Sequence, residues 1–136
     1  MPTGPIVPDT SAWVEFLRGT GSRVDRRFDE LVRDPALVVV TEPVMMELLA
    51  GARNPTEWRD LRRLMARADF APVRTPEDWH EAAVIHRRVR TGGRTLRSML
   101  DCLIAAVAIR IGAAVLHADA DFELIAEHSA LEIAAP

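Results

Sequence analysis

The feature of this chain that most constrains its fold is an alternation of short apolar runs with longer stretches that have the period of an amphipathic helix. The short runs predict buried strands, and the stretches between them are long enough to form helical crossovers. Strands joined by helices favour a parallel sheet that is covered on both faces. We therefore predict an α/β fold with about five strands, at residues 6–7, 37–40, 70–73, 114–116 and 131–133.

The composition is that of one globular domain. Of the 136 residues, 49% are hydrophobic and 27% are charged, which is enough apolar surface for a core and too much for a disordered chain. Because no repeat, low-complexity tract or linker divides the sequence, we expect residues 1–136 to form a single domain. The uncharged apolar run at residues 102–109 is far shorter than the about 20 residues that span a bilayer.

The residue types that are rare or missing exclude several kinds of site. Cys102 is the only cysteine, so neither an internal disulfide nor a zinc site of several thiolates can form. A lone cysteine and the lack of an export signal together predict a cytoplasmic protein. All 17 basic residues are arginine, so no lysine can contact a nucleotide phosphate, form a Schiff base or serve a receiver-type phosphorylation site.

Acidic residues follow two of the predicted strands. Parallel sheets bind ligands beyond the carboxyl ends of their strands, and Asp9 and Asp119 follow the first and fourth strands. Asp9 has an alternative interpretation as a helix cap shared with Thr10 and Ser11, and Ser11 is itself a candidate N-cap of the first helix. Asp121 is explained by an N-cap position on the last helix, but Asp119 has no such explanation.

Two further acids stand among apolar residues. Asp101 is the only acid of an apolar helix predicted over residues 98–111. It is either a functional residue or a partner of the Ser98 cap at the positive end of the helix dipole. Glu47 has largely apolar neighbours three and four positions away, although a solvated helix face is the commoner position for such a glutamate.

These acids could converge on one crevice, since each lies at a separate helix or strand end. Several carboxylates within a few ångströms repel each other and raise each other's pKa unless a cation neutralises them. Ligands that are all oxygens select Mg²⁺ or Mn²⁺ over zinc. Such a centre activates water and binds phosphate oxygens, so hydrolysis of a phosphodiester is the leading chemistry.

Four motifs in this order resemble those of one family over essentially the whole chain. They are VPDTSAW at 7–13, MELLAG at 46–51, DCLIAA at 101–106 and LHADADF at 116–122. The chain resembles the PIN-domain ribonucleases and, within them, the VapC toxins of bacterial toxin–antitoxin pairs. The resemblance implies a three-layer α/β/α fold with strand order 3-2-1-4-5, which would put Asp9 and Asp119 at adjacent strand ends.

The resemblance also implies a site and its partners. Matching motif to motif, the catalytic acids are expected to be Asp9, Glu47, Asp101 and Asp119; all four would bind Mg²⁺, or Mn²⁺ as a substitute, together with Asp121. Ser11 resembles the hydroxyl that orients the first aspartate. The implied protein is an endoribonuclease that cleaves RNA with metal-activated water, forms a homodimer and is neutralised by a VapB-like antitoxin. Ala118, Ala120 and Pro8 depart from the residues that many relatives carry.

A chain with net charge −3 must present positive charge locally to bind RNA. Residues 87–97 contain five arginines and no acid, and we expect Arg94 and Arg97 to contact phosphates through their guanidinium groups. A solvated helix face with a mobile loop, or a contact with the inhibitory partner, would also explain this segment. Trp13, Trp58 and Trp79 are expected in the core, and Cys102 and His117 are expected to be structural.

Two other functions remain open at this point. One is a catalytically silent PIN-like scaffold that binds RNA or protein, which the presence of all four acids argues against. The other is an aspartate-based phosphoryl-transfer domain, which the absence of lysine disfavours.

Overall fold

The computed structural model describes residues 4–136. Its strands are short and its helices contain most of the chain. None of the helices in this range is long and apolar enough to cross a membrane. In chain order the elements are β1 Ile6–Pro8, α1 Thr10–Arg18, α2 Arg23–Leu31, the 3₁₀ helix η1 Pro35–Leu37, β2 Val39–Val40, α3 Glu42–Ala50, α4 Pro55–Ala66, β3 Asp69–Phe70, α5 Glu77–Thr91, α6 Met99–Ile111, β4 Ala114–Leu116, α7 Asp121–Glu127 and β5 Glu132–Ile133.

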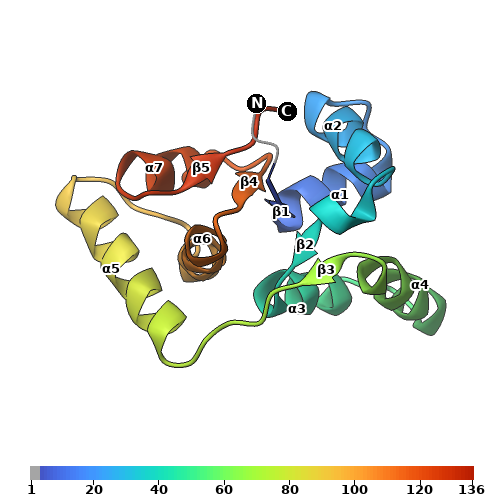
Figure 1. The fold of residues 1–136 in the computed structure, drawn as a ribbon, viewed down its shortest axis with the longest axis horizontal. Helices are drawn as coiled ribbons and strands as arrows, with labels where there is room; N and C mark the ends of the chain where they lie inside the picture. Colours follow the sequence, from blue (N-terminus) through green and yellow to red (C-terminus); the bar gives the residue numbers. More distant parts are fainter. Residues whose placement is uncertain (1–3) are drawn as a thin grey trace.

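All strand pairs are parallel. Strand β1 pairs with β4, β4 pairs with β5, and β2 pairs with β3. The hydrogen-bonded strands form two sheets, β1-β4-β5 and β2-β3, and an isolated parallel bridge between Ile6 and Val38, the residue before β2, joins them in the order 3-2-1-4-5. Figure 1 shows the α1–α2 pair on one side of this row of strands and the α5–α6 pair on the other. The predicted α/β class and strand order are therefore confirmed.

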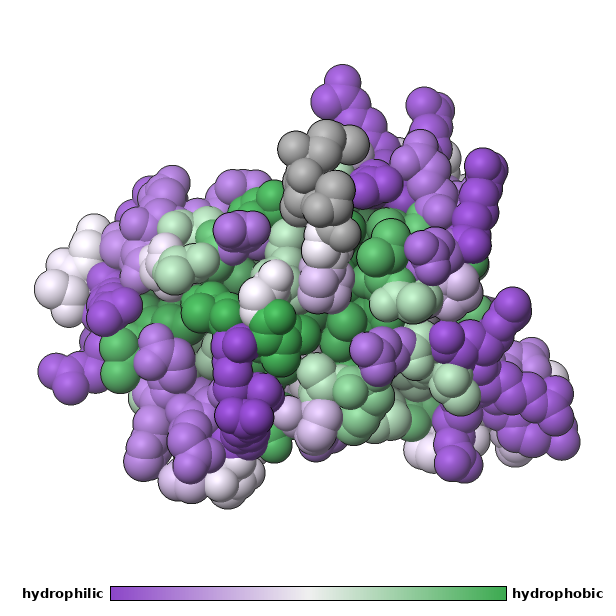
Figure 2. Space-filling view, in the orientation of Figure 1, coloured by the Kyte–Doolittle hydropathy of each residue, from purple (hydrophilic) through white to green (hydrophobic). Residues whose placement is uncertain are grey.

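Helix α6 forms the centre of the core. Every residue from Cys102 to Ala108 is buried, and a helix that is apolar on all sides must be covered on all sides. Helix α5 packs along it, and β4 follows it after Gly112, whose positive φ of 69° ends the helix. In Figure 2 an apolar band crosses the middle of the visible face between fringes of hydrophilic side chains.

Two predicted strands are shorter in the structure. The run at 37–40 contains only the two strand residues of β2, because η1 occupies its beginning. The run at 70–73 becomes β3, which is displaced towards Asp69 and lies at the edge of the sheet. Pro72 cannot donate a ladder hydrogen bond, so the strand ends before it.

Two predicted caps were misplaced by one or two residues. The first helix begins at Thr10 and its N-cap is Asp9, whose side chain accepts a hydrogen bond from the Ala12 backbone N–H. Ser11 lies inside the helix instead of capping it. Helix α7 begins at Asp121, so Asp121 is a first-turn residue and not the N-cap.

The tryptophan prediction holds for one residue of three. Trp13 is 2% exposed and packs edge-on against Phe28, but Trp58 and Trp79 are 44% and 51% exposed. On α5 the buried face passes through Ile85 and Val89, which turns Trp79 outward. The expected core role of Trp58 and Trp79 was therefore wrong.

Candidate metal centre

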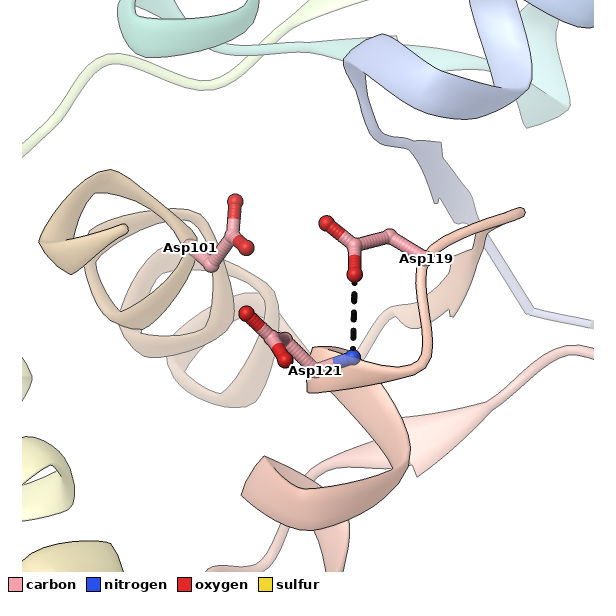
Figure 3. Close-up of side chains that lie close together, drawn as sticks. All are labelled: Asp101, Asp119 and Asp121. Carbon is pink, nitrogen blue, oxygen red and sulfur yellow. Dashed lines mark hydrogen bonds between the residues drawn. The ribbon is translucent and has the colours of Figure 1, made fainter. Parts of the chain in front are cut away.

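Three aspartates from two helices and a loop meet beside the carboxyl end of β4. Asp119 lies in the loop after β4, Asp121 begins α7, and Asp101 lies in the first turn of α6. One carboxylate oxygen from each lies within 4.8 Å of the others. Figure 3 shows these side chains pointing toward a common space. Asp119 and Asp121 are 18 and 20 residues from Asp101 in the sequence, but the three lie together in space. We call them the three-aspartate cluster.

Asp101 is the member of the cluster with the fewest partners. The residue is 8% exposed, and its Oδ2 atom is buried without a hydrogen bond from the described residues. Burial, and then the charges of Asp119, Asp9, Glu47 and Asp121, raise the pKa of Asp101 to about 7. A buried carboxylate without a partner is costly, and a cation would supply the missing interaction.

Asp119 and Asp121 are held from the outer side of the cluster by Arg97. The Arg97 guanidinium places Nη2 2.7 Å from Asp119 Oδ1 and Nε 3.5 Å from Asp121 Oδ2. The backbone N–H of Arg97 also donates to Asp121 Oδ2 at 2.9 Å. Within the loop, the backbone N–H of Asp121 donates to Asp119 Oδ1 at 3.0 Å (Figure 3). Arg97, which we expected on RNA, therefore lies on two of the acids in this structure.

Asp9 is the N-cap of α1, which is one of the two interpretations that its sequence position allowed, and its role as a ligand stays a prediction. It is 3% exposed, and its Oδ1 atom accepts hydrogen bonds from the Ala12 backbone N–H at 3.1 Å and the Ser11 hydroxyl at 2.7 Å. Burial raises the pKa of Asp9, and the hydrogen bonds from Ser11 and Ala12 offset only part of that rise. The Ala118 backbone N–H donates to Ser11 Oγ at 2.8 Å, so Ser11 connects Asp9 to the loop that carries Asp119.

Glu47 is half-buried and is held by a residue that the sequence interpretation did not assign to the site. The hydroxyl of Thr10 donates to Glu47 Oε1 at 2.7 Å. Glu47 and Asp9 do not belong to the three-aspartate cluster, but both are near enough for their charges to raise the pKa of Asp101. One usable signal for Thr10 was present in the sequence. It directly follows Asp9 at the start of α1, so its hydroxyl could have been expected near the other acids.

The neighbouring histidine and cysteine have structural contacts. The Asp119 backbone N–H donates to His117 Nδ1 at 3.2 Å, which leaves Nε2 to carry the proton and donate to Glu123 Oε1 at 3.1 Å. The His117 ring also stacks on Phe122. Cys102 is fully buried, and burial with the nearby charge of Asp101 raises the pKa of its thiol to about 11, so the thiol stays protonated.

The arginine segment divides between two environments. Arg97 contacts the acids, whereas Arg94 is exposed and forms no ion pair with any residue from 4 to 136. The three-aspartate cluster offers carboxylate oxygens, and one of them, the buried Asp101 Oδ2, has no hydrogen-bond partner in the described part of the chain. This donor set fits a hard divalent cation and does not fit zinc, which prefers nitrogen and sulfur.

The comparison with known families agrees with this geometry. The profile of the PIN domain matches residues 6–128. The chain belongs to the PIN-domain family. Ribonuclease VapC11 of Mycobacterium tuberculosis and VapC ribonuclease Mb1587 of Mycobacterium bovis are each 42% identical to this PIN domain over 130 residues, covering 95% of it and 97% of the relative. The predicted resemblance to the PIN-domain VapC ribonucleases is thus confirmed.

A solved structure has the same fold as this PIN domain. It is VapBC2 from Rickettsia felis bound to a DNA fragment from its promoter, with a TM-score of 0.73 at 13% identity. The alignment covers 95% of this PIN domain and 96% of the solved chain. At that identity the likeness concerns the fold alone.

Proposed function

We propose that this chain is a Mg²⁺-dependent endoribonuclease and the toxin of a VapBC pair. The observation that carries the proposal is the buried Oδ2 atom of Asp101, which lies beside Asp119 and Asp121 and has no hydrogen-bond partner within residues 4–136. The names of its relatives, VapC ribonucleases with 42% identity over nearly the whole chain, support the substrate class. The combination favours a nuclease over a silent scaffold, because a scaffold has no use for a buried carboxylate without a partner.

The proposed ligands are Asp9, Glu47, Asp101, Asp119 and Asp121, with Mg²⁺ as the cation and Mn²⁺ as a substitute. When bound, a divalent cation would lower the pKa of a water molecule and stabilise charge on phosphate oxygens. The Ser11 hydroxyl orients Asp9 through its 2.7 Å hydrogen bond to Oδ1. Near neutral pH the carboxyl of Asp101 holds a proton in part of the molecules, and a cation must displace that proton to bind.

The proposed RNA contacts come from the loop between α5 and α6. Arg94 is exposed there without an ion pair to the described residues, so its guanidinium is available to an RNA phosphate. The side chain of Arg97 is 75% exposed although it contacts two carboxylates, so RNA could still reach it from solvent. Both residues lie directly before the helix that carries Asp101, which brings positive charge to the edge of the acidic centre.

The partners and the organisation of the protein are also proposals. A VapB-like antitoxin would neutralise the toxin, and solved VapBC assemblies share this fold. We further propose that residues 1–136 act as one domain, that the toxin forms a homodimer, and that it acts in the cytoplasm, where its RNA substrate is found. Light scattering of the purified protein, alone and with its antitoxin, tests both assemblies.

The test is cleavage of labelled RNA by purified protein with Mg²⁺ or Mn²⁺ and with EDTA. We expect cleavage only with the cation, and its loss in Asp9→Asn and Asp101→Asn. Asp29→Asn is the matched control, because Asp29 is an exposed acid on α2. Cleavage that persists in EDTA and in both site variants would refute the proposal. Binding of RNA without any cleavage would favour the silent scaffold.

A further inference from the structure

The hydrogen bonds of Asp119 and Asp121 use only one oxygen of each carboxylate. Asp119 Oδ1 accepts from Arg97 Nη2 and from the Asp121 backbone, and Asp121 Oδ2 accepts from the backbone and Nε of Arg97. Among residues 4–136, nothing donates to Asp119 Oδ2 or to Asp121 Oδ1. Figure 3 shows one oxygen of each carboxylate directed toward Asp101. The arginine therefore orders both carboxylates and leaves one oxygen of each free.

Arg97 reaches this position from outside the cluster. Its side chain is 75% exposed, whereas those of Asp119 and Asp121 are 24% and 10% exposed. The backbone N–H of Arg97 fixes the loop to Asp121, so the guanidinium starts from an anchored point. A long exposed side chain that spans two carboxylates at 2.7 Å and 3.5 Å suits the fork geometry of arginine, which a lysine could not reproduce.

We propose that Arg97 is a positioning residue of the metal centre, which holds Asp119 and Asp121 so that their free oxygens face Asp101. This inference rests on the proposed function only in requiring that the cluster binds a divalent cation. Hydrogen bonds from outer residues orient carboxylate ligands, and their removal weakens metal binding. The nearby positive charge opposes cation binding, but solvent screens this repulsion because the guanidinium is exposed.

The charge and the positioning effects of Arg97 predict opposite changes in affinity. If the arginine acts only as a nearby positive charge, its removal tightens cation binding. If it positions the two carboxylates, its removal weakens binding. Arg94 provides the matched control, because it belongs to the same loop and has the same charge but forms no ion pair with the three aspartates among the described residues.

The experiment is calorimetric titration of the metal-free protein with Mn²⁺, without RNA. We expect Arg97→Gln to weaken Mn²⁺ affinity by about 10–100-fold. Arg94→Gln should leave the affinity within about threefold or tighten it. Arg97→Lys should lie between the wild type and Arg97→Gln, because one ammonium group cannot span both carboxylates. Circular dichroism and melting of the metal-free variants verify that each one folds.

A double variant separates positioning from a general structural effect. If Arg97 acts through Asp119, removing it in an Asp119→Ala background should cost much less affinity than in the wild type. Equal losses in both backgrounds would overturn the proposal, as would Mn²⁺ binding to Arg97→Gln that is as tight as in the wild type. Failure of the wild type to bind Mn²⁺ would instead refute the proposed metal-dependent function, and this inference with it.

Discussion

A buried aspartate lies near each end of helix α6, and the two aspartates differ in their hydrogen-bond partners. At the C-terminal end, Asp78 of α5 is 3% exposed and receives Nε and Nη2 of Arg110 at 2.9–3.1 Å and the Arg74 backbone N–H at 2.7 Å. At the N-terminal end, Asp101 is 8% exposed and its Oδ2 has no partner among the described residues. Both residues are nearly inaccessible to solvent, but only Asp78 has hydrogen-bond partners for its carboxylate among the described residues.

The pKa values of the two acids shift in opposite directions for this reason. Burial raises the pKa of Asp78, but the hydrogen bonds and charges of Arg110 and Arg74 outweigh it and the net pKa is lowered. Burial also raises the pKa of Asp101, and the surrounding acids raise it further, to about 7. The ion pair of Asp78 with Arg110 connects α5 to α6, whereas the three-aspartate cluster leaves the buried Oδ2 atom of Asp101 without a partner among the described residues. The missing partner of Asp101 is therefore the reason to place the proposed metal centre at the N-terminal end of α6.

The largest effect should come from breaking the complete pair. Asp78→Asn leaves the Arg110 guanidinium unpaired in a partly buried position, so we expect a loss of about 3 kcal/mol in the free energy of unfolding. Urea denaturation measures the loss. Arg53→Gln, which removes an exposed ion pair with Glu57, should leave stability unchanged. A stability of Asp78→Asn equal to the wild type would show that the two ends do not differ in the way described.

Addition of a divalent cation should stabilise the protein by binding at the N-terminal end of α6, where Asp101 lies. A cation that binds only the folded state raises stability by about 2.7 kcal/mol at 100 times its dissociation constant. We expect Mn²⁺ to raise the melting temperature of the wild type, and of Asp78→Asn by a similar amount, but not that of Asp101→Asn. Equal changes in the melting temperatures of the wild type and Asp101→Asn would show that Asp101 is not a ligand of the cation.

The substitution Asp101→Asn should change the free energy of unfolding in the opposite direction to Asp78→Asn. In the metal-free protein at pH 8, Asp101→Asn removes a buried charge that is repelled by its neighbours. We therefore expect a gain on the order of 1–2 kcal/mol in the free energy of unfolding, measured by urea denaturation in EDTA. A loss as large as that of Asp78→Asn would mean that Asp101 has a stabilising partner in solution.

The smallest effect should be the change in the free energy of unfolding with pH. The pKa of Asp101 is raised in the folded state, from 3.8 to about 7, so its contribution falls as pH rises between these values. The pKa of Asp78 is lowered, so its contribution is complete above pH 4 and is lost as pH falls below that. Melting in EDTA from pH 3 to pH 8 should show both trends. A wild-type curve parallel to that of Asp101→Asn between pH 4 and pH 7 would contradict the first.

Local signals predicted the parts of this protein that depend on neighbours in sequence. The apolar runs located the strands within a few residues, and the motifs around Asp9, Asp101 and Asp119 located the acids. Local signals failed for Trp58 and Trp79, because a helical period does not tell which of its faces meets the sheet. They also gave no sign of the Asp78–Arg110 pair, whose members lie 32 residues apart and meet only when α5 packs on α6.

The amino-acid order by itself determined the class of fold, the family and the identity of the candidate ligands, because strand periodicity and motif spacing are properties of short segments. Tertiary structure decided which oxygens meet, that the buried Oδ2 atom of Asp101 has no hydrogen-bond partner among residues 4–136, and that Arg97 contacts Asp119 and Asp121. The physical reason is that hydrogen bonds and charge interactions act over a few ångströms. Which groups fall within that range is set only when distant segments pack against each other.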